Sequence, residues 1–302
     1  MPGAQLVEIV PNFSEGRREA VIRAIVAALS VPGVRLLYAG PDPDHNRLDC
    51  TLVGPPHAVH HSAFMGAVRA TELIDMGEHR GSHPRMGALD VLPFVPLGDS
   101  SMRECIALAR ETARELGEDL GIPVYCYGEA ALSPERHGLA DVRRGEYEGL
   151  KADVAAGRRL PDFGPSEIGR AGAVAVGARK PLIAFNVYLA GSEEAAKEVA
   201  RTVRESSGGL PALQAIGFAV PERRCVTVSM NLTDHEVTGL EAAFSAVRDE
   251  GARRGMRVLE AEIVGLVPRA ALPDGYAEAL QLEGFDAAKQ ILEEAVEGET
   301  NA

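Results

Sequence analysis

The sequence predicts a mixed α+β protein, an α/β sandwich made of two similar halves, and three observations lead to this prediction. Short apolar runs of strand length alternate with longer stretches that have the apolar spacing of amphipathic helices. The same order of elements, strand-helix-strand-strand-helix-strand, can be followed in both halves of the chain. The 302 residues also exceed the usual length of a single domain.

The first half contains one complete pattern. Its first strand is an apolar run bounded by Pro11, and its first helix carries apolar side chains along one stripe. We expect the strand, helix, two strands, helix and fourth strand at residues 6–10, 19–29, 34–38, 49–53, 57–74 and 88–96.

The chain then continues before the pattern recurs. Ser101 and Glu104 match a capping box, which predicts a helix over residues 102–120, and a strand is expected at 123–127. Residues 133–172 are rich in glycine, proline and charge, so we expect a loop with short helical turns, which is either functional or a linker. Gly172 and Gly177 then predict either a tight turn or a close approach of the backbone to a ligand.

The second half repeats the order of elements. Arg224 precedes one of its strands as Arg47 precedes one in the first half, and Thr233 with Glu236 forms a capping-box pattern at the start of the later helix. We expect a strand at 180–186 and a helix at 193–204, followed by two short strands, of which the second starts at 226, and then a helix at 236–251 and a strand at 258–267.

Two β-α-β-β-α-β patterns predict duplicated ferredoxin-like subdomains. We place the two domains at residues 1–178 and 179–302, with a ligand cleft between them, because ligand sites often lie where two domains meet. The alternative is that the order of elements arose by chance, since few residues are identical between the halves.

Composition excludes several classes of protein. Asp and Glu number 44 against 31 Lys and Arg, a formal net charge of −13, so a broad nucleic-acid or anionic-membrane surface is not expected. No apolar stretch has the ~18 residues of a membrane helix, and the N-terminus does not resemble a signal peptide. The four scattered cysteines indicate neither a zinc ribbon nor a disulfide framework. We therefore expect a cytoplasmic protein.

Most histidines have ordinary explanations. His79 and His83 have the i, i+4 spacing of helical metal ligands, but the glycines and proline around them disfavour a helix and Arg80 stands where a metalloprotease has glutamate. We therefore predict no metal. A solvated helix face accounts for His57, His60 and His61.

His83 lies in a loop rich in glycine and proline, just before an apolar strand. A rigid scaffold often presents a catalytic side chain from such a loop, and an imidazole can move protons near neutral pH. The alternative is a loop histidine that bonds only to nearby backbone. Arg170, Arg179 and Lys180 form a basic cluster that suggests an anionic substrate such as a carboxylate or polyglutamate tail, although a solvated loop would also explain it.

Several long motifs resemble those of the glutamate formimidoyltransferases, the formiminotransferase domain of formimidoyltransferase-cyclodeaminase. The resemblance spans nearly the whole chain. Its motifs are V-P-N-F-S-E-G-R at 10–17, L-I-D-M at 73–76, H-P-R-M-G-A-L-D-V at 83–91, P-V-Y-C-Y-G-E-A at 123–130, R-G-E-Y-E at 144–148, D-F-G-P-S at 162–166, G-A-R-K-P-L-I-A-F-N at 177–186 and V-G-L-V-P at 264–268.

The resemblance implies a stand-alone transferase that moves the formimino group from N-formimidoyl-L-glutamate to N5 of tetrahydrofolate, late in histidine degradation to glutamate. It implies two subdomains with folate between them, a homodimer, tetrahydrofolate as co-substrate and no metal. The chain leaves no room for a cyclodeaminase, which would then be a separate partner. The family's catalytic histidine falls on His83, although Ser82 replaces the usual glutamate.

The resemblance also places two folate-contacting segments on this chain. The second lacks the paired lysines of the mammalian-type version, which bears on binding of polyglutamylated folate. The segments are Gly164, Pro165, Ser166, Glu167, Ile168, Gly169, Arg170, Ala171 and Gly172, and then Gly208, Gly209, Leu210, Pro211, Ala212, Leu213, Gln214, Ala215, Ile216 and Gly217.

Four further residues are expected to orient substrate. Asn12, Asn46 and Arg47 lie at predicted strand ends that face the expected cleft, and Arg85 follows His83 closely in the sequence. Asn12 would equally serve as a helix cap or turn residue.

Three alternative functions stay open at this point. One is transfer of a formyl group between 5-formyltetrahydrofolate and glutamate, because the sequence does not distinguish the two donors. Another is a folate-binding protein without catalysis. The third is a metal-dependent hydrolase, which the residues support least.

Overall fold

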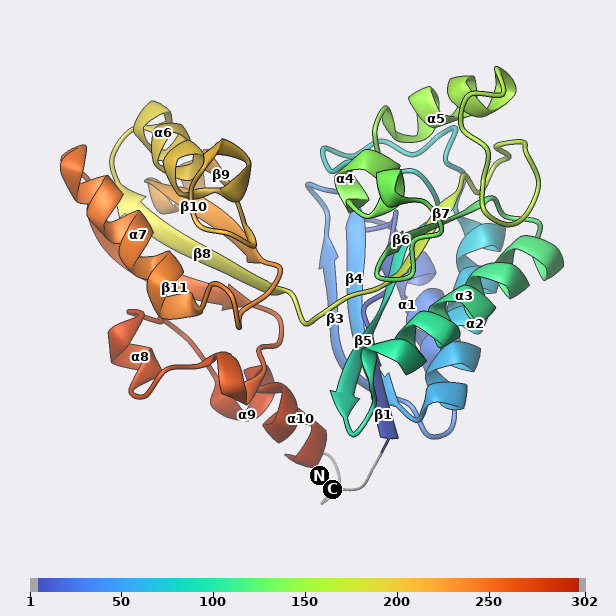
Figure 1. Ribbon diagram of the computed structural model, residues 1–302, viewed down its shortest axis with the longest axis horizontal. Coiled ribbons are helices and arrows are strands. Elements are labelled where there is room, and N and C mark those ends of the chain that lie inside the picture. The colour runs from blue at the N-terminus through green and yellow to red at the C-terminus, as the bar shows by residue number, and fades with distance from the viewer. Residues whose placement is uncertain (1–4, 299–302) are drawn as a thin grey trace. The chain divides into compact units, whose positions relative to one another are not determined.

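The structure is a computed structural model that describes residues 5–298 of the chain. The chain divides into two compact units, unit 1 (Met1–Arg179) and unit 2 (Lys180–Ala302) (Figure 1). Each unit combines a β-sheet with helices, so the predicted mixed α+β class is confirmed. No helix within residues 5–298 is long and apolar enough to cross a membrane.

Unit 1 contains a seven-stranded sheet within its described residues. The interrupted first strand, β1 and β2, lies between β4 and β5, and β3 pairs with the outer edge of β4. β7 and β6 extend the sheet beyond β5 in parallel. The strands are β1 (Gln5–Ile9), β2 (Asn12–Phe13), β3 (Arg35–Asp42), β4 (Arg47–Gly54), β5 (Leu89–Gly98), β6 (Val124–Gly128) and β7 (Val174–Ala178).

Three long helices of unit 1 lie together along one face of this sheet (Figure 1). Phe13 of β2 is fully buried and reaches α2 at Gly66, where a Cβ would lie 3.3 Å from the ring. The predicted capping box of Ser101 and Glu104 is confirmed at the start of α3. The helices are α1 (Glu19–Leu29), α2 (Pro56–Leu73), α3 (Met102–Asp119), α4 (Leu139–Val142) and α5 (Glu146–Ala155), with a 3₁₀ turn at Pro134–Arg136.

Unit 2 has a four-stranded antiparallel sheet in the order β9-β10-β8-β11. Its core includes Phe185 and Val228 from the two central strands and Phe244 from α7. The elements are β8 (Ile183–Ala190), α6 (Glu193–Val203), β9 (Leu213–Val220), β10 (Cys225–Leu232), α7 (Leu240–Arg253), β11 (Arg257–Val264), α8 (Tyr276–Ala279), α9 (Ala287–Gln290) and α10 (Leu292–Gly298), with 3₁₀ turns at Glu205–Ser207, Pro221–Arg223 and Arg269–Ala271.

Three sequence predictions about local structure are wrong in whole or in part. A tight turn is present only at Gly172, whose amide donates to the Gly169 carbonyl at 3.1 Å, and the residues from Val174 onward form the buried strand β7. The Thr233 capping box is absent: α7 begins only at Leu240, and the Thr233 hydroxyl donates instead to the Ala212 carbonyl at 3.1 Å. His60 does not lie on a solvated face, because it contacts Thr112 on α3, with 2.8 Å between Nδ1 and Oγ1.

Replacing Phe185 with alanine is expected to lower the free energy of unfolding of unit 2 by ~3–5 kcal/mol, because the fully buried ring would leave a cavity. Urea unfolding of the full chain, followed by circular dichroism, measures the change. The control is Val237→Ala, whose side chain is 57% exposed and whose effect should stay within about 0.5 kcal/mol. Equal effects of the two substitutions would show that β8 is not at the centre of the core.

Candidate active site

The loop that carries His83 joins α2 to β5 and is held by the segment that follows β2. Ser14 Oγ donates to the Gly87 carbonyl at 2.7 Å, at the end of this loop. Arg17 donates to the carbonyls of Pro43 and Arg80, at 2.7 and 3.2 Å. The β2–α1 segment therefore ties the His83 loop to the β3–β4 turn.

Asn46 also joins the β2–α1 segment to the His83 loop. Its Oδ1 accepts from the Gly16 amide and its Nδ2 donates to the Arg80 carbonyl, both at 2.9 Å. Its φ of 52° lies in the left-handed region, which asparagine tolerates better than most residues. Gly16 has no room for a side chain, because a Cβ would lie 2.0 Å from the Asp42 carbonyl oxygen.

Glu15 fixes the start of α1. Its buried carboxylate accepts from the backbone amides of Arg17 and Arg18 at 2.9 and 2.8 Å, and pairs with Arg18 Nε at 2.5 Å. Arg18 is the N-cap of α1 and Arg17 precedes it, so Glu15 holds the backbone immediately before the first turn. The conspicuous N-terminal motif thus acts as a clamp that joins three segments of unit 1.

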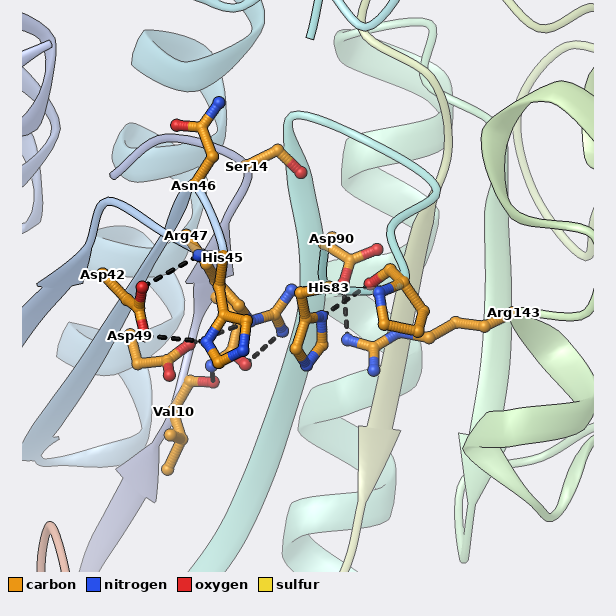
Figure 2. A network of polar contacts seen from close by, with 12 residues as sticks. Val10, Ser14, Asp42, His45, Asn46, Arg47, Asp49, His83, Asp90 and Arg143 are labelled. Atoms are coloured by element: carbon orange, nitrogen blue, oxygen red, sulfur yellow. Dashed lines mark hydrogen bonds and ion pairs between the residues drawn. The ribbon is translucent and has the colours of Figure 1, made fainter. Parts of the chain in front are cut away.

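His83 points one ring nitrogen at its own backbone. Its Nδ1 lies 2.7 Å from the Pro84 carbonyl oxygen. Because a carbonyl only accepts, Nδ1 carries the hydrogen and Nε2 keeps the lone pair. Nε2 has no hydrogen-bond partner among the residues that the structure describes. The His45 ring meets that of His83 edge to face, with 5.8 Å between centroids (Figure 2).

The surroundings of His83 favour the neutral imidazole. Burial is the main cause that lowers its pKa, to about 4, and the Arg47 charge and then the Arg143 charge act in the same direction. The hydrogen bond to Pro84 and the Asp90 charge oppose this shift without reversing it. At neutral pH the ring is therefore uncharged, with Nε2 available to accept a proton.

Asp90 is the centre of the charge network beside this ring (Figure 2). It is fully buried, and its Oδ2 contacts Arg47 Nη1 at 2.8 Å and also Arg143 Nη2. Its Oδ1 accepts from the Met86 amide at 2.7 Å. Burial opposes ionisation of Asp90, but the Arg143 and Arg47 charges outweigh it and hold its pKa below the ordinary value. Asp90 is thus an ionised link between two arginines.

A β-bulge turns Asp90 toward these arginines. Asn12 pairs with Val91 and Phe13 with Leu89, which leaves Asp90 as an extra residue of β5. Such bulges re-aim a side chain and are frequent beside active sites. The bulge lets the Asp90 side chain reach Arg47, while the preceding residue, Leu89, still pairs with Phe13 in the core.

The structure brings together only part of the predicted set. Arg47 and Asn12 lie in the network, joined by a hydrogen bond from Arg47 Nη2 to Asn12 Oδ1. The Asn46 amide is occupied by backbone groups, as described above. Arg85 turns away, with Nη2 2.7 Å from Glu148 and Nη1 3.0 Å from Glu146, both on α5.

Asp90, Arg143 and His45 were missed by reasoning from the sequence. Asp90 had one usable signal, since it is a lone charge within an otherwise apolar strand. Arg143 had none, because it lies among many charged residues in the segment 133–172.

The two predicted folate segments belong to different units. The first lies beside the His83 loop, where the Ala88 amide donates to the Ala171 carbonyl at 2.8 Å and Gly87 forms a bridge with Gly172. The second belongs to unit 2, and its residues 213–216 help to line a cavity of about 480 Å³. Gly217 allows close packing of α6, because a Cβ there would lie 2.3 Å from the Ala196 carbonyl.

His79 and His83 do not form a helical metal site, because the loop between them has no helix. His79 is buried, its Nε2 lies 3.0 Å from the Asn46 carbonyl, and burial lowers its pKa. Within residues 5–298 no cluster of three or more histidine, cysteine or carboxylate side chains is arranged for a metal ion.

Two family models match the chain. The N-terminal subdomain of the formiminotransferase domain matches residues 6–179, and the formiminotransferase domain matches residues 184–293. The chain belongs to the formiminotransferase family. The resemblance predicted from its motifs is thereby confirmed.

Similar proteins extend this assignment along the whole chain. A glutamate formimidoyltransferase of Thermoplasma acidophilum is 47% identical, with 98% of this chain and 99% of that protein covered. The same enzyme of Streptococcus pyogenes is 43% identical over 96% and 98%. Formimidoyltransferase-cyclodeaminase of Mus musculus is 45% identical over 91% of this chain but only 52% of the mouse protein.

The Asp90→Asn variant of this formiminotransferase-family chain should lose ~3–5 kcal/mol of stability at pH 7, because two buried guanidinium groups would lose their shared charge. Urea unfolding measures the loss. Since folding lowers the Asp90 pKa from 3.8, the wild type should itself lose this contribution as pH falls below about 4, and the gap should narrow.

Asp49→Asn is the matched control for this prediction. Asp49 also pairs with Arg47, at 3.0 Å, but its side chain is 48% exposed, so its loss should change stability by less than about 1 kcal/mol. Similar losses in the two variants would mean that burial of Asp90 does not decide the stability of the network.

Proposed function

We propose that the chain is a glutamate formimidoyltransferase that moves the formimino group from N-formimidoyl-L-glutamate to N5 of tetrahydrofolate, the late step of histidine degradation. The observation that carries the proposal is a neutral His83 with Nε2 unpartnered, in a family whose similar members are named for this activity. A neutral imidazole is the form that a proton-transfer catalyst needs first.

The reaction moves one proton from N5 of tetrahydrofolate to the departing nitrogen of glutamate. N5 of tetrahydrofolate attacks the amidine carbon, and a tetrahedral intermediate forms. His83 Nε2 takes the N5 proton and then gives a proton to the departing glutamate nitrogen. The bond from that nitrogen to the amidine carbon breaks, which yields glutamate and 5-formiminotetrahydrofolate. One imidazole serves both steps because the transfers are sequential, so the ring returns to its starting state.

Charge around His83 supports both halves of this cycle. Burial, together with the Arg47 and Arg143 charges, keeps the resting imidazole unprotonated and favours release of the proton once the imidazolium forms. Proton return to the leaving nitrogen is then favourable. The clamp of Ser14, Asn46 and Arg17 holds the loop in place, which limits the reorganisation that each turnover requires.

The duplication predicted from the sequence is also part of this proposal. The central strands of unit 1 follow the order β3-β4-β1/β2-β5, and those of unit 2 follow β9-β10-β8-β11, with helices at corresponding places in the chain. This correspondence supports two ferredoxin-like subdomains that meet near residues 178 and 179. A folate cleft between them, the homodimer, the cytoplasmic location and a separate cyclodeaminase stay predictions.

Replacing His83 with alanine should lower kcat/KM by ~10²–10⁴-fold while leaving folate affinity within about threefold, because only proton transfer is lost. The assay mixes enzyme, tetrahydrofolate, formiminoglutamate and a chelator. Acid quenching then cyclises the product to the methenyl form, which is read by absorbance. The control is His57→Ala, an exposed residue at the start of α2, which should retain wild-type activity.

Other results would change the assignment. Loss of folate binding in the His83 variant would make this histidine a binding residue. A wild type that binds folate but gives no product from formiminoglutamate would favour 5-formyltetrahydrofolate as donor or a role in binding alone.

A further inference from the structure

Arg143 is buried with fewer partners than its side chain can hold. It follows α4 and is 14% exposed, and its Nη2 contacts Asp90 Oδ2. Its Nε is buried without a hydrogen-bond partner. A buried donor without an acceptor is unfavourable, so the site lacks a group that accepts a hydrogen bond at this place.

The network around Arg143 also has too little negative charge. The buried carboxylate of Asp90 is shared between Arg143 and Arg47, so two guanidinium charges face one buried carboxylate. Asp49 pairs with Arg47 but is half exposed and screened by water. One positive charge therefore remains in excess beside His83, and an anion would offset it.

We propose that Arg143, together with Arg47, binds the α-carboxylate of the amidine donor and makes the enzyme specific for N-formimidoyl α-amino acids. This inference rests on the proposed function. The α-carbon of formiminoglutamate carries both the carboxylate and the nitrogen that leaves, so a receptor beside His83 suits that carboxylate. The planar guanidinium of an arginine is suited to bonds with a carboxylate, and the Arg143 side chain remains 14% exposed beside its contact with Asp90.

The same contact adjusts the basicity of His83. The groups that face its ring are His45 from the β3–β4 turn, Arg47 from β4, Asp90 from β5 and Arg143 from the segment after α4. In the unliganded protein burial lowers the pKa of His83 most, and Arg47 and, to a smaller extent, Arg143 add to this shift. A carboxylate bound to them offsets their charge, so His83 becomes a better base when the donor is present.

Two unreactive probes test the receptor on the full-length protein. N-acetyl-L-glutamate keeps the α-carboxylate, whereas 4-acetamidobutyrate is the same molecule without it. We expect the wild type to bind the first ~10- to 100-fold more tightly, and Arg143→Met to abolish this preference. The control is Arg144→Met, because Arg144 is the adjacent residue, 78% exposed and paired with Asp141 rather than Asp90.

Nuclear magnetic resonance of labelled histidines, assigned with His83→Gln, follows the pKa of His83. It should rise above about 4 when N-acetyl-L-glutamate binds, and by a smaller amount in unliganded Arg143→Met, because burial and Arg47 still lower it there. Arg143→Lys keeps the charge but not the planar fork. It should therefore leave the pKa of unliganded His83 low and still lose most of the α-carboxylate preference.

The outcomes separate this inference from the proposed function. The inference is overturned if the wild type does not distinguish the probes, if Arg143→Met keeps the preference, or if that variant weakens binding of 5-formyltetrahydrofolate instead. Preference for the α-carboxylate without formimino transfer would support the receptor and reject the transferase. If Arg143→Met transfers the formimino group with an unchanged KM for formiminoglutamate, the transferase is supported and the receptor is rejected.

Discussion

One buried carboxylate organises the candidate active site of unit 1. Asp90 has no contact with solvent, yet it stays ionised because Arg47 and Arg143 both contact it. Buried ion pairs stabilise a fold poorly compared with apolar packing, so such a network is better understood through what it positions. Here it sets the distance and charge of two guanidinium groups beside the His83 ring.

The backbone around this network is fixed by independent contacts. Ser14, Gly16 and Arg17 hold the ends of two other loops, while Glu15 holds the start of α1. Each of these contacts joins a side chain to a backbone carbonyl or amide of another residue. The clamp therefore fixes where the loops run and leaves the side chains of the site to be set by Asp90. The clamp thus fixes the backbone of the His83 loop, and the Asp90 network sets the charge around the His83 ring.

Periodicity in the sequence predicted most of the regular elements, because buried stripes and alternating strands follow directly from side-chain burial. It failed at β7, where two glycines suggested a turn. Position 177 requires glycine because a Cβ there would clash with the Tyr127 ring, whose carbon atoms would lie 2.6 Å away. It also failed at Thr233, since the tertiary contact to Ala212 replaced the local cap.

The site was predictable only in part. His83 could be selected from its motif and its loop, and Arg47 from its place at the end of a predicted strand. Arg143 could not, because its role depends on meeting a carboxylate 53 residues away. Asn46 illustrates the opposite case: its position suggested substrate binding, but its amide is used to join two stretches of backbone.

The bulge in β5 makes the site sensitive to chain length rather than to composition. If one residue were removed between Gly87 and Val91, the ladder opposite Asn12 and Phe13 would become regular, and strict alternation would place the acid on the side of the helices. A carboxylate there would have no arginine to meet. A homologue could thus keep every residue type of this strand and still lose the network through a single deletion, so the spacing from Gly87 to Val91 is as much a part of the site as the side chains.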